Sequence, residues 1–348
     1  MARTSTKRHN IGEMNDHLEP IERVQFDTQQ LVTEHPPIWR DRNKRIVFEI
    51  ACPPGSAHCG RLDYSRWRAM ALPLTVDAAA AARRVVGRAG FYEYVPAREV
   101  PGAMEWHVNF ADPRLFVAYG SSLFAQDEMQ VAEHPALGAL REALDAQGAS
   151  AVTMENGKPT PVLVMGVERR CRVATDRNAA EGRPRGLYGN QFARAAAEAV
   201  RRATTRLDPP TITNLIAMAA PHGGYGRYSA DEIERVLITA FTAFRAAVIE
   251  STRCQGAACP IVVHTGFWGC GAFGGHRMLM VMLQVLAGEM AGLERMVFYT
   301  GDAVGAEALA TARRRIEEDL TSGPGTGMGD LITRVASIGF EWGVSDGN

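Results

Sequence analysis

The sequence predicts an α/β fold in which a mixed sheet is flanked by helices, with an N-terminal extension. Short apolar or alternating runs, typical of strands, recur along the chain. Segments rich in alanine, arginine and glutamate at helical spacing fill the intervals between them. The length of 348 residues is sufficient for one large domain of this kind. Alternating strands and helices favour a sheet covered by helices on both faces.

The elements follow in order along the chain. Residues 1–40 are polar, lack a periodic pattern and include His35-Pro36-Pro37, which predicts an arm of little regular order before a single domain at 41–348. Strands are predicted at Arg45–Ala51, Glu105–Phe110, Val162–Val167, Asn214–Ala220, Ile261–His264 and Met296–Tyr299. Helices are predicted at Val76–Arg88, Leu137–Asp145, Gln191–Thr205, Ala230–Ser251, Gly275–Ala291 and Ala306–Leu320, and Thr175–Gly189 is predicted to be a surface loop.

Composition disfavours several classes of protein. The formal net charge is −1, and the only block of like charge is Arg313-Arg314-Arg315, so we expect no direct nucleic-acid partner. No segment has the pattern of a signal peptide or a membrane span, which predicts a soluble cytoplasmic protein without a membrane partner. Cys52, His58 and Cys59 lie close together, but no second pair stands at metal-binding spacing, so we expect reduced thiols and no metal or other cofactor.

The most informative segment is a buried strand that enters a glycine-rich turn and continues into a helix. Five of the ten residues from Gly266 to Gly275 are glycine, and an apolar helix follows. Glycines allow backbone amides to approach phosphate oxygens, and a helix N-terminus favours an anion. Such turns also occur without a ligand. The interleaved Phe267, Trp268 and Phe273 favour a nucleotide pocket, because bare loops seldom expose such rings.

A second segment places two carboxylates at the start of a helix. The strand-like run Trp106–Asp112 leads through an apolar loop into Gln126-Asp127-Glu128. The two carboxylates could simply stabilise the helix dipole. Alternatively, one of them faces a pocket, where desolvation raises its pKa and allows it to act as a general acid at a glycosidic bond.

Together these segments resemble the poly(ADP-ribose) glycohydrolase family. The run Thr265-Gly-Phe-Trp-Gly-Cys-Gly-Ala-Phe-Gly-Gly275 is similar to that family's phosphate loop, with Phe267 in place of asparagine. Val108-Asn-Phe-Ala-Asp112 resembles the family's Val-Asp-Phe-Ala-Asn, and Gln126-Asp127-Glu128 resembles its Gln-Glu-Glu signature. Phe298-Tyr-Thr-Gly-Asp302 falls where the family has a strand that ends in Gly-Asp.

The resemblance implies a macrodomain-like fold and a hydrolase, specifically a glycosidase that cleaves a ribosyl bond in an ADP-ribosyl substrate, either polymeric or derived from NAD. It implies that Glu128 is the catalytic acid, that Asp127 orients the distal ribose, and that Gln126 supports the loop. Substrate-binding positions would be Asp112, Gln126, Gly269, Cys270, Gly271, Ala272, Phe273 and Gly274. Tyr225, Arg227 and Tyr228 follow a predicted strand and are candidates for contact with the adenine or the leaving group, or they form an ordinary turn.

The sequence departs from the family pattern at three places. Equal spacing puts Phe116-Val117-Ala118 where the family has a triple glycine that wraps the substrate. Thr300 falls where the family stacks an aromatic ring, and Asp112 replaces an asparagine. Two alternatives to polymer hydrolysis therefore remain: a module that binds ADP-ribose or an NAD metabolite without cleaving it, and an enzyme of specialised metabolism that acts on an NAD-derived nucleotide.

Overall fold

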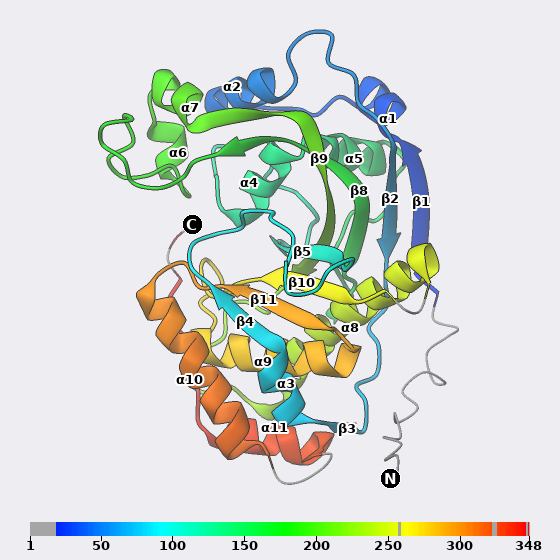
Figure 1. Ribbon diagram of the computed structural model, residues 1–348, viewed down its shortest axis with the longest axis vertical. Coiled ribbons are helices and arrows are strands. Elements are labelled where there is room, and N and C mark those ends of the chain that lie inside the picture. Colours follow the sequence, from blue (N-terminus) through cyan, green and yellow to red (C-terminus); the bar gives the residue numbers. More distant parts are fainter. Residues whose placement is uncertain (1–18, 257–258, 322–325, 346, 348) are drawn as a thin grey trace, which may run out of the picture.

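The computed structural model describes residues 19–256, 259–321, 326–345 and 347. Its centre is an eight-stranded mixed sheet in the order β1-β2-β8-β9-β5-β10-β11-β4 (Figure 1). The strands span Glu22–Asp27 (β1), Arg61–Arg66 (β2), Val162–Val173 (β8), Thr204–Ala219 (β9), Met104–Ala111 (β5), Ile261–Thr265 (β10), Arg295–Tyr299 (β11) and Val85–Arg88 (β4). The pairs from β1 to β9 are antiparallel, and those from β9 to β4 are parallel. The predicted mixed sheet is confirmed.

Helices cover both faces of this sheet (Figure 1). One layer contains α8 (Ala230–Gln255), α9 (Arg277–Ala291), α3 (Ala78–Arg84), α10 (Ala303–Asp319) and α11 (Met328–Ser337). The other contains α1 (Thr28–Glu34), α2 (Arg42–Ala51), α4 (Gln126–Glu133), α5 (Ala136–Ala146), α6 (Gln191–Arg194) and α7 (Ala197–Ala203). Short strand pairs join β3 (Thr75–Val76) to β12 (Thr326–Gly327) and β6 (Met154–Glu155) to β7 (Lys158–Pro159).

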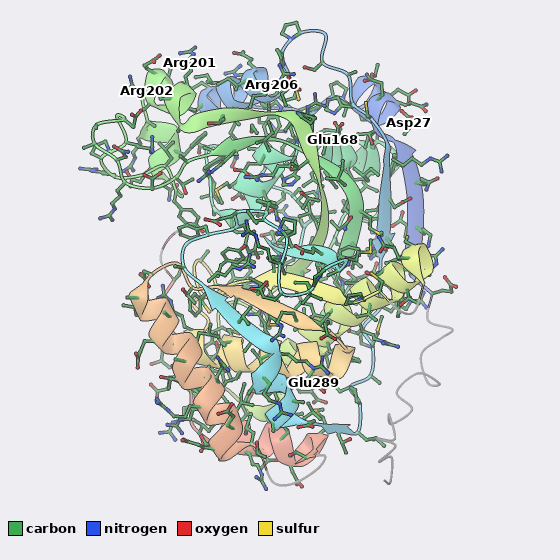
Figure 2. The ribbon with its side chains drawn as sticks, viewed as in Figure 1. Asp27, Glu168, Arg201, Arg202, Arg206 and Glu289 are labelled. Carbon is green, nitrogen blue, oxygen red and sulfur yellow. The ribbon has the colours of Figure 1, made fainter. Side chains whose placement is uncertain are left out.

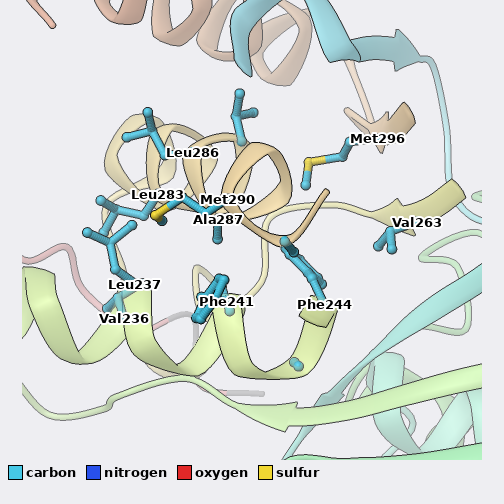
Figure 3. Packing of buried hydrophobic residues seen from close by; sticks show 14 of the residues in the cluster. Val236, Leu237, Phe241, Phe244, Val263, Leu283, Leu286, Ala287, Met290 and Met296 are labelled. Carbon is cyan, nitrogen blue, oxygen red and sulfur yellow. The ribbon is translucent and has the colours of Figure 1, made fainter. Parts of the chain in front are cut away.

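The larger hydrophobic core lies between the sheet and the α8–α9 layer. Phe241 and Phe244 on α8 face Leu283 and Met290 on α9, and all four side chains are buried (Figure 3). Complete burial of such a side chain stabilises the fold by about 1.5–3 kcal/mol. The long apolar α8 and α9 therefore fix the position of β10 and of the turn that follows it.

Three predicted elements are wrong in type or extent. Residues 45–51 belong to α2, because the Asp41 carboxylate accepts the amides of Asn43 and Lys44 and caps a helix there. The helix predicted at 76–88 ends at Arg84, where the chain becomes the edge strand β4. The helix predicted at 191–205 is interrupted by extended backbone at Ala195, and β9 begins at Thr204.

The N-terminal extension is only in part an arm. Residues 1–18 lie outside the described residues. Residues 22–27 form β1, which pairs with β2, and residues 28–34 form α1, capped by Asp27. The alternation of half-buried and exposed residues in β1 is the pattern of an edge strand, which a polar composition conceals. The single domain predicted at 41–348 stays a prediction.

Candidate functional site

The carboxyl ends of the parallel strands β5, β9, β10 and β11 lie at one edge of the sheet, and the glycine turn is there. The Trp268 indole donates to the backbone carbonyl of Met218 at 2.9 Å, which ties the turn to the end of β9. A Cβ added to Gly269 would lie 2.5 Å from the Ala220 side chain, so only glycine fits against that strand end. Ligands of α/β sheets bind at this edge.

The turn leads into α9 through backbone that favours glycine. Gly269 and Gly274 have φ values of 76° and 68°, in the left-handed region. Between them lie Cys270, Gly271, Ala272 and Phe273, of which Ala272 is exposed and the others are partly buried. His276 caps α9 by accepting the Leu279 amide. The turn thus presents backbone groups at the N-terminus of a 15-residue helix.

Phe267, which replaces the family's asparagine, faces inward. Its ring lies edge-on to Phe298, with centroids 5.1 Å apart, and the Arg277 guanidinium lies 5.1 Å from its centroid. Gly305 at the start of α10 must be glycine here, because an added Cβ would overlap the Thr300 backbone carbonyl and would lie 2.7 Å from the Phe267 ring. Phe267 therefore packs the base of the turn.

Gln126 joins α4 to the sheet. Its Oε1 accepts the Phe110 amide at 2.7 Å and its Nε2 donates to the Val108 carbonyl at 3.1 Å, so the side chain pairs with β5 as a neighbouring strand would. The Phe110 ring in turn lies 3.5 Å from the position of a Cβ on Gly266. Phe110 therefore connects the start of the acidic helix to the start of the glycine turn.

Asp127 and Glu128 both lie in the interior, with exposed fractions of 6% and 4%. Asn109 on β5 donates from its Nδ2 to Asp127 at 3.0 Å, and the Ala125 amide donates to Glu128 Oε2 at 3.0 Å. Burial raises the pKa of the Asp127 carboxyl well above its ordinary value, and the charge of Glu128 adds to the rise. Burial also raises the pKa of Glu128, against the opposing effect of Lys44. Glu128 therefore caps its own helix, and its raised pKa also suits a general acid.

Lys44 is a charged residue of this site that the sequence analysis missed. It lies on α2, is completely buried, and donates from Nζ to the Tyr119 carbonyl at 2.6 Å. Burial lowers its pKa to about 8, while the charges of Glu128, Asp41 and Asp127 act in the opposite direction. A strand at residues 45–51, as the sequence predicts, gives no reason for Lys44 to be buried, whereas the helix α2 does.

The loop before α4 contains one residue whose backbone conformation favours glycine. Phe116 has a φ of 52°, a left-handed value that favours glycine, yet its ring is completely buried in the core between the sheet and α5. Gly120 does not provide a close approach to a ligand, because an added Cβ would lie 2.3 Å from the Ile38 carbonyl. Phe116 thus points away from the sheet edge, and Gly120 packs against the chain before α2.

The other predicted residues have mixed outcomes. Asp112 follows β5 with its side chain 42% exposed and accepts the Arg114 amide at 2.8 Å. Tyr225 is 99% exposed and is not brought to the turn. Tyr228 is brought there, because its hydroxyl accepts the His276 amide at 3.1 Å and its ring stacks on Trp342. Thr300 is buried, and its hydroxyl donates to the Arg88 carbonyl.

The cysteine and histidine cluster considered for a metal is part of a buried ion network. His58 Nδ1 lies 3.0 Å from a carboxylate oxygen of Glu168, and Arg170 donates to the same oxygen at 2.6 Å. Glu168, labelled in Figure 2, lies on β8. Among the described residues, no group of three or more potential ligands could hold a metal ion. Within the same residues, no helix has the length and apolar character needed to cross a membrane.

Comparison with known proteins gives one family and several distant structures. Residues 185–307 match the model described as poly(ADP-ribose) glycohydrolase (PARG), Macro domain fold. This match confirms the resemblance found in the motifs and the macrodomain-like fold. No curated protein matches the chain.

Three of the similar solved structures are bacterial. Poly(ADP-ribose) glycohydrolase from Thermomonospora curvata is 16% identical over 84% of this chain and 85% of its own, with a TM-score of 0.40. The same enzyme bound to the inhibitor ADP-HPD is 16% identical over 78% and 98%, with a TM-score of 0.43. The Deinococcus radiodurans enzyme in complex with ADP-ribose is 18% identical over 70% and 91%, with a TM-score of 0.39. TM-scores this low add nothing to the fold described above.

Proposed function

We propose that this chain, whose residues 185–307 match the poly(ADP-ribose) glycohydrolase model, hydrolyses a ribosyl glycosidic bond in an ADP-ribosyl substrate, with Glu128 as the general acid. One observation carries this proposal. A pair of buried carboxyl groups with raised pKa values stands at the carboxyl edge of the parallel strands, and Phe110 links it to the glycine turn. Two groups whose environment favours a proton are suited to acid catalysis near neutral pH.

The reaction needs few groups. Backbone amides from Gly269 to Phe273, aided by the α9 N-terminus, bind the diphosphate. Glu128 gives its proton to the leaving oxygen as the bond to the anomeric carbon breaks, and the carbon develops oxocarbenium character. Water then adds to that carbon, and its proton returns to the Glu128 carboxylate, which restores the acid. Asp127 accepts hydrogen bonds from the ribose hydroxyls.

Substrate access requires a local change. Glu128 is only 4% exposed, so the proposed reaction requires substrate binding to uncover its carboxyl. The loop between β5 and α4, whose last residue Ala125 donates its amide to Glu128, is tied to the chain around α2 by Lys44 and Gly120. Closure and opening of such loops accompany catalysis in many enzymes.

The test is the isosteric variant Glu128→Gln. General acid catalysis contributes about 10²–10⁴-fold, so turnover of an ADP-ribosyl substrate should fall by that factor while the Kd for ADP-ribose changes little. Glu317→Gln, an exposed carboxylate on α10, serves as the matched control and should retain parental activity. Parental hydrolysis by Glu128→Gln, measured as release of ADP-ribose, contradicts the assignment.

A second candidate is a module that binds ADP-ribose without cleaving it. Two observations favour it: Phe116 occupies the position of a family glycine, and Glu128 is covered. Calorimetry with ADP-ribose, together with a product assay on mono- and poly(ADP-ribosyl) substrates, separates the two functions. Binding without product supports the module, and product formation that depends on Glu128 supports the hydrolase.

A further inference from the structure

The ammonium group of Lys44 is buried, so other interactions must offset the cost of removing its charge from water. Its side chain has no exposed surface, and its ammonium group donates to the backbone carbonyls of Tyr119 at 2.6 Å and Ala118 at 3.5 Å. The Phe124 ring lies 5.9 Å from Nζ. Two carbonyl groups do not neutralise a buried ammonium ion, which is costly without an opposite charge.

The opposite charge comes from the acidic helix. The carboxyl groups whose charges act on Lys44 are those of Glu128 and Asp127 on α4, which are buried as it is, and that of Asp41 at the start of its own helix. Asp41 is engaged by two backbone amides of α2. Asp112, which also acts on both α4 carboxyls, is 42% exposed on its side chain and is therefore solvated. One buried ammonium is thus matched against two buried carboxyls.

This ratio determines the number of protons. With both carboxyls ionised, the buried cluster of Lys44, Asp127 and Glu128 would carry one uncompensated negative charge. With both protonated, it would carry one uncompensated positive charge. Charge balance in a poorly solvated interior is reached when the Asp127 and Glu128 pair holds one proton, and that proton belongs to the pair.

We propose that Lys44 is a positioning residue that keeps one proton on the Asp127–Glu128 pair and fixes the Ala118–Tyr119 loop. The inference rests on the proposed function, because it assigns the origin of the acid form that the hydrolysis uses. The carbonyl contacts fix the loop, and the charge sets the protonation of the pair. These two roles respond differently to substitution.

The experiment compares Lys44→Met and Lys44→Arg in the full chain, with the exposed Lys158→Met on β7 as the control. The Lys44 charge lowers the pKa of both carboxyls, so the pH profile of kcat/KM for Lys44→Met should move to higher pH. Lys44→Arg keeps the charge, so its profile should stay near that of the parent even if its rate falls. A Lys44→Met profile that coincides with the parent's overturns the proposal, because a merely structural lysine would change the rate alone.

Two further measurements do not depend on turnover. The double variant Lys44→Met with Asp127→Asn removes one positive and one negative charge, so it should be more stable at pH 7 than Lys44→Met alone. Carboxyl titration by ¹³C NMR in the parent should show one proton leaving the pair at a pH above the ordinary range of a carboxyl group. No recovery in the double variant, or a pair already fully ionised at pH 6, contradicts the proposal. The stability comparison and the titration can both be interpreted even if the parent hydrolyses no substrate. In that case only the proposed function is contradicted.

Discussion

The Asn109 side chain donates a hydrogen bond from Nδ2 to the Asp127 carboxylate at 3.0 Å, and the same amide nitrogen reaches Gln130 Oε1 at 2.9 Å. The family that this chain resembles has aspartate at the position of Asn109. An amide is the only isostere of aspartate that can donate to a neighbouring carboxylate. Asparagine at position 109 can therefore donate a hydrogen bond to the buried carboxylate of Asp127, which an ionised aspartate could not do.

Asn109→Asp should destabilise the protein in a pH-dependent manner. It replaces the donor to Asp127 with a second acceptor and adds a negative charge beside it, at a cost of about 1–3 kcal/mol at pH 7. The loss should shrink as pH falls, because the carboxyls become protonated. Asn109→Ala, the control, removes the donor without adding a charge, so its loss should change less with pH. Denaturant unfolding of both variants from pH 4 to 8 makes the comparison, and equal pH dependence would contradict it.

Glu128→Gln should stabilise the chain at neutral pH while it removes activity. Burial raises the folded-state pKa of Glu128 above its unfolded value. The stabilising contribution of such a group is fully present below the unfolded pKa and is lost as pH rises through the folded pKa. An amide never ionises, so the variant should match the parent near pH 4 and exceed it above pH 6, with a Tm higher by about 2 °C. A Tm that falls at pH 7 would mean that Glu128 is ionised and favourably paired.

Gly269→Ala should damage both stability and ADP-ribose binding. An added methyl would meet Ala220 at 2.5 Å and would stand at a φ of 76°. Gly292 at the end of α9 is the matched control, because it has a φ of 84° but nothing within 4 Å of an added Cβ. Gly292→Ala should lower the free energy of unfolding by about 1–2 kcal/mol, the cost of a left-handed backbone conformation for alanine. It should leave the Kd for ADP-ribose unchanged. Calorimetry and thermal unfolding of the two variants provide the measurement, and a parental Kd for Gly269→Ala argues against the turn as the diphosphate site.

Phe116→Gly should not restore the family's glycine loop. Glycine adopts the left-handed conformation of residue 116 without strain, which raises the free energy of unfolding by about 1 kcal/mol. The loss of a completely buried ring from the core lowers the same free energy by about 3–5 kcal/mol. We expect a net loss of stability in denaturant unfolding and no gain in hydrolysis of polymer. If the variant proves more stable than the parent, the ring contributes little to that core.

Part of this site was accessible from residues alone. The strand, turn and helix around Gly266–Gly275 were predicted because glycine spacing and an apolar run are local signals. The helix that begins at Gln126 and its two carboxylates were identified for the same reason. The burial of Lys44 and the hydrogen bond from the His276 amide to the Tyr228 hydroxyl were not predicted, because each depends on segments far apart in the sequence. A lysine also gives no local sign that it will be buried.

Residue types at short spacing were enough to predict the alternation of strands and helices, the glycine turn and the acidic helix. Contacts between distant segments were needed to show that β1 joins the sheet, that Phe116 is buried in the core, and that Lys44, Asp127 and Glu128 are all buried. The pKa values of these three residues depend on how completely other elements exclude water from them, and no local pattern of residues specifies that.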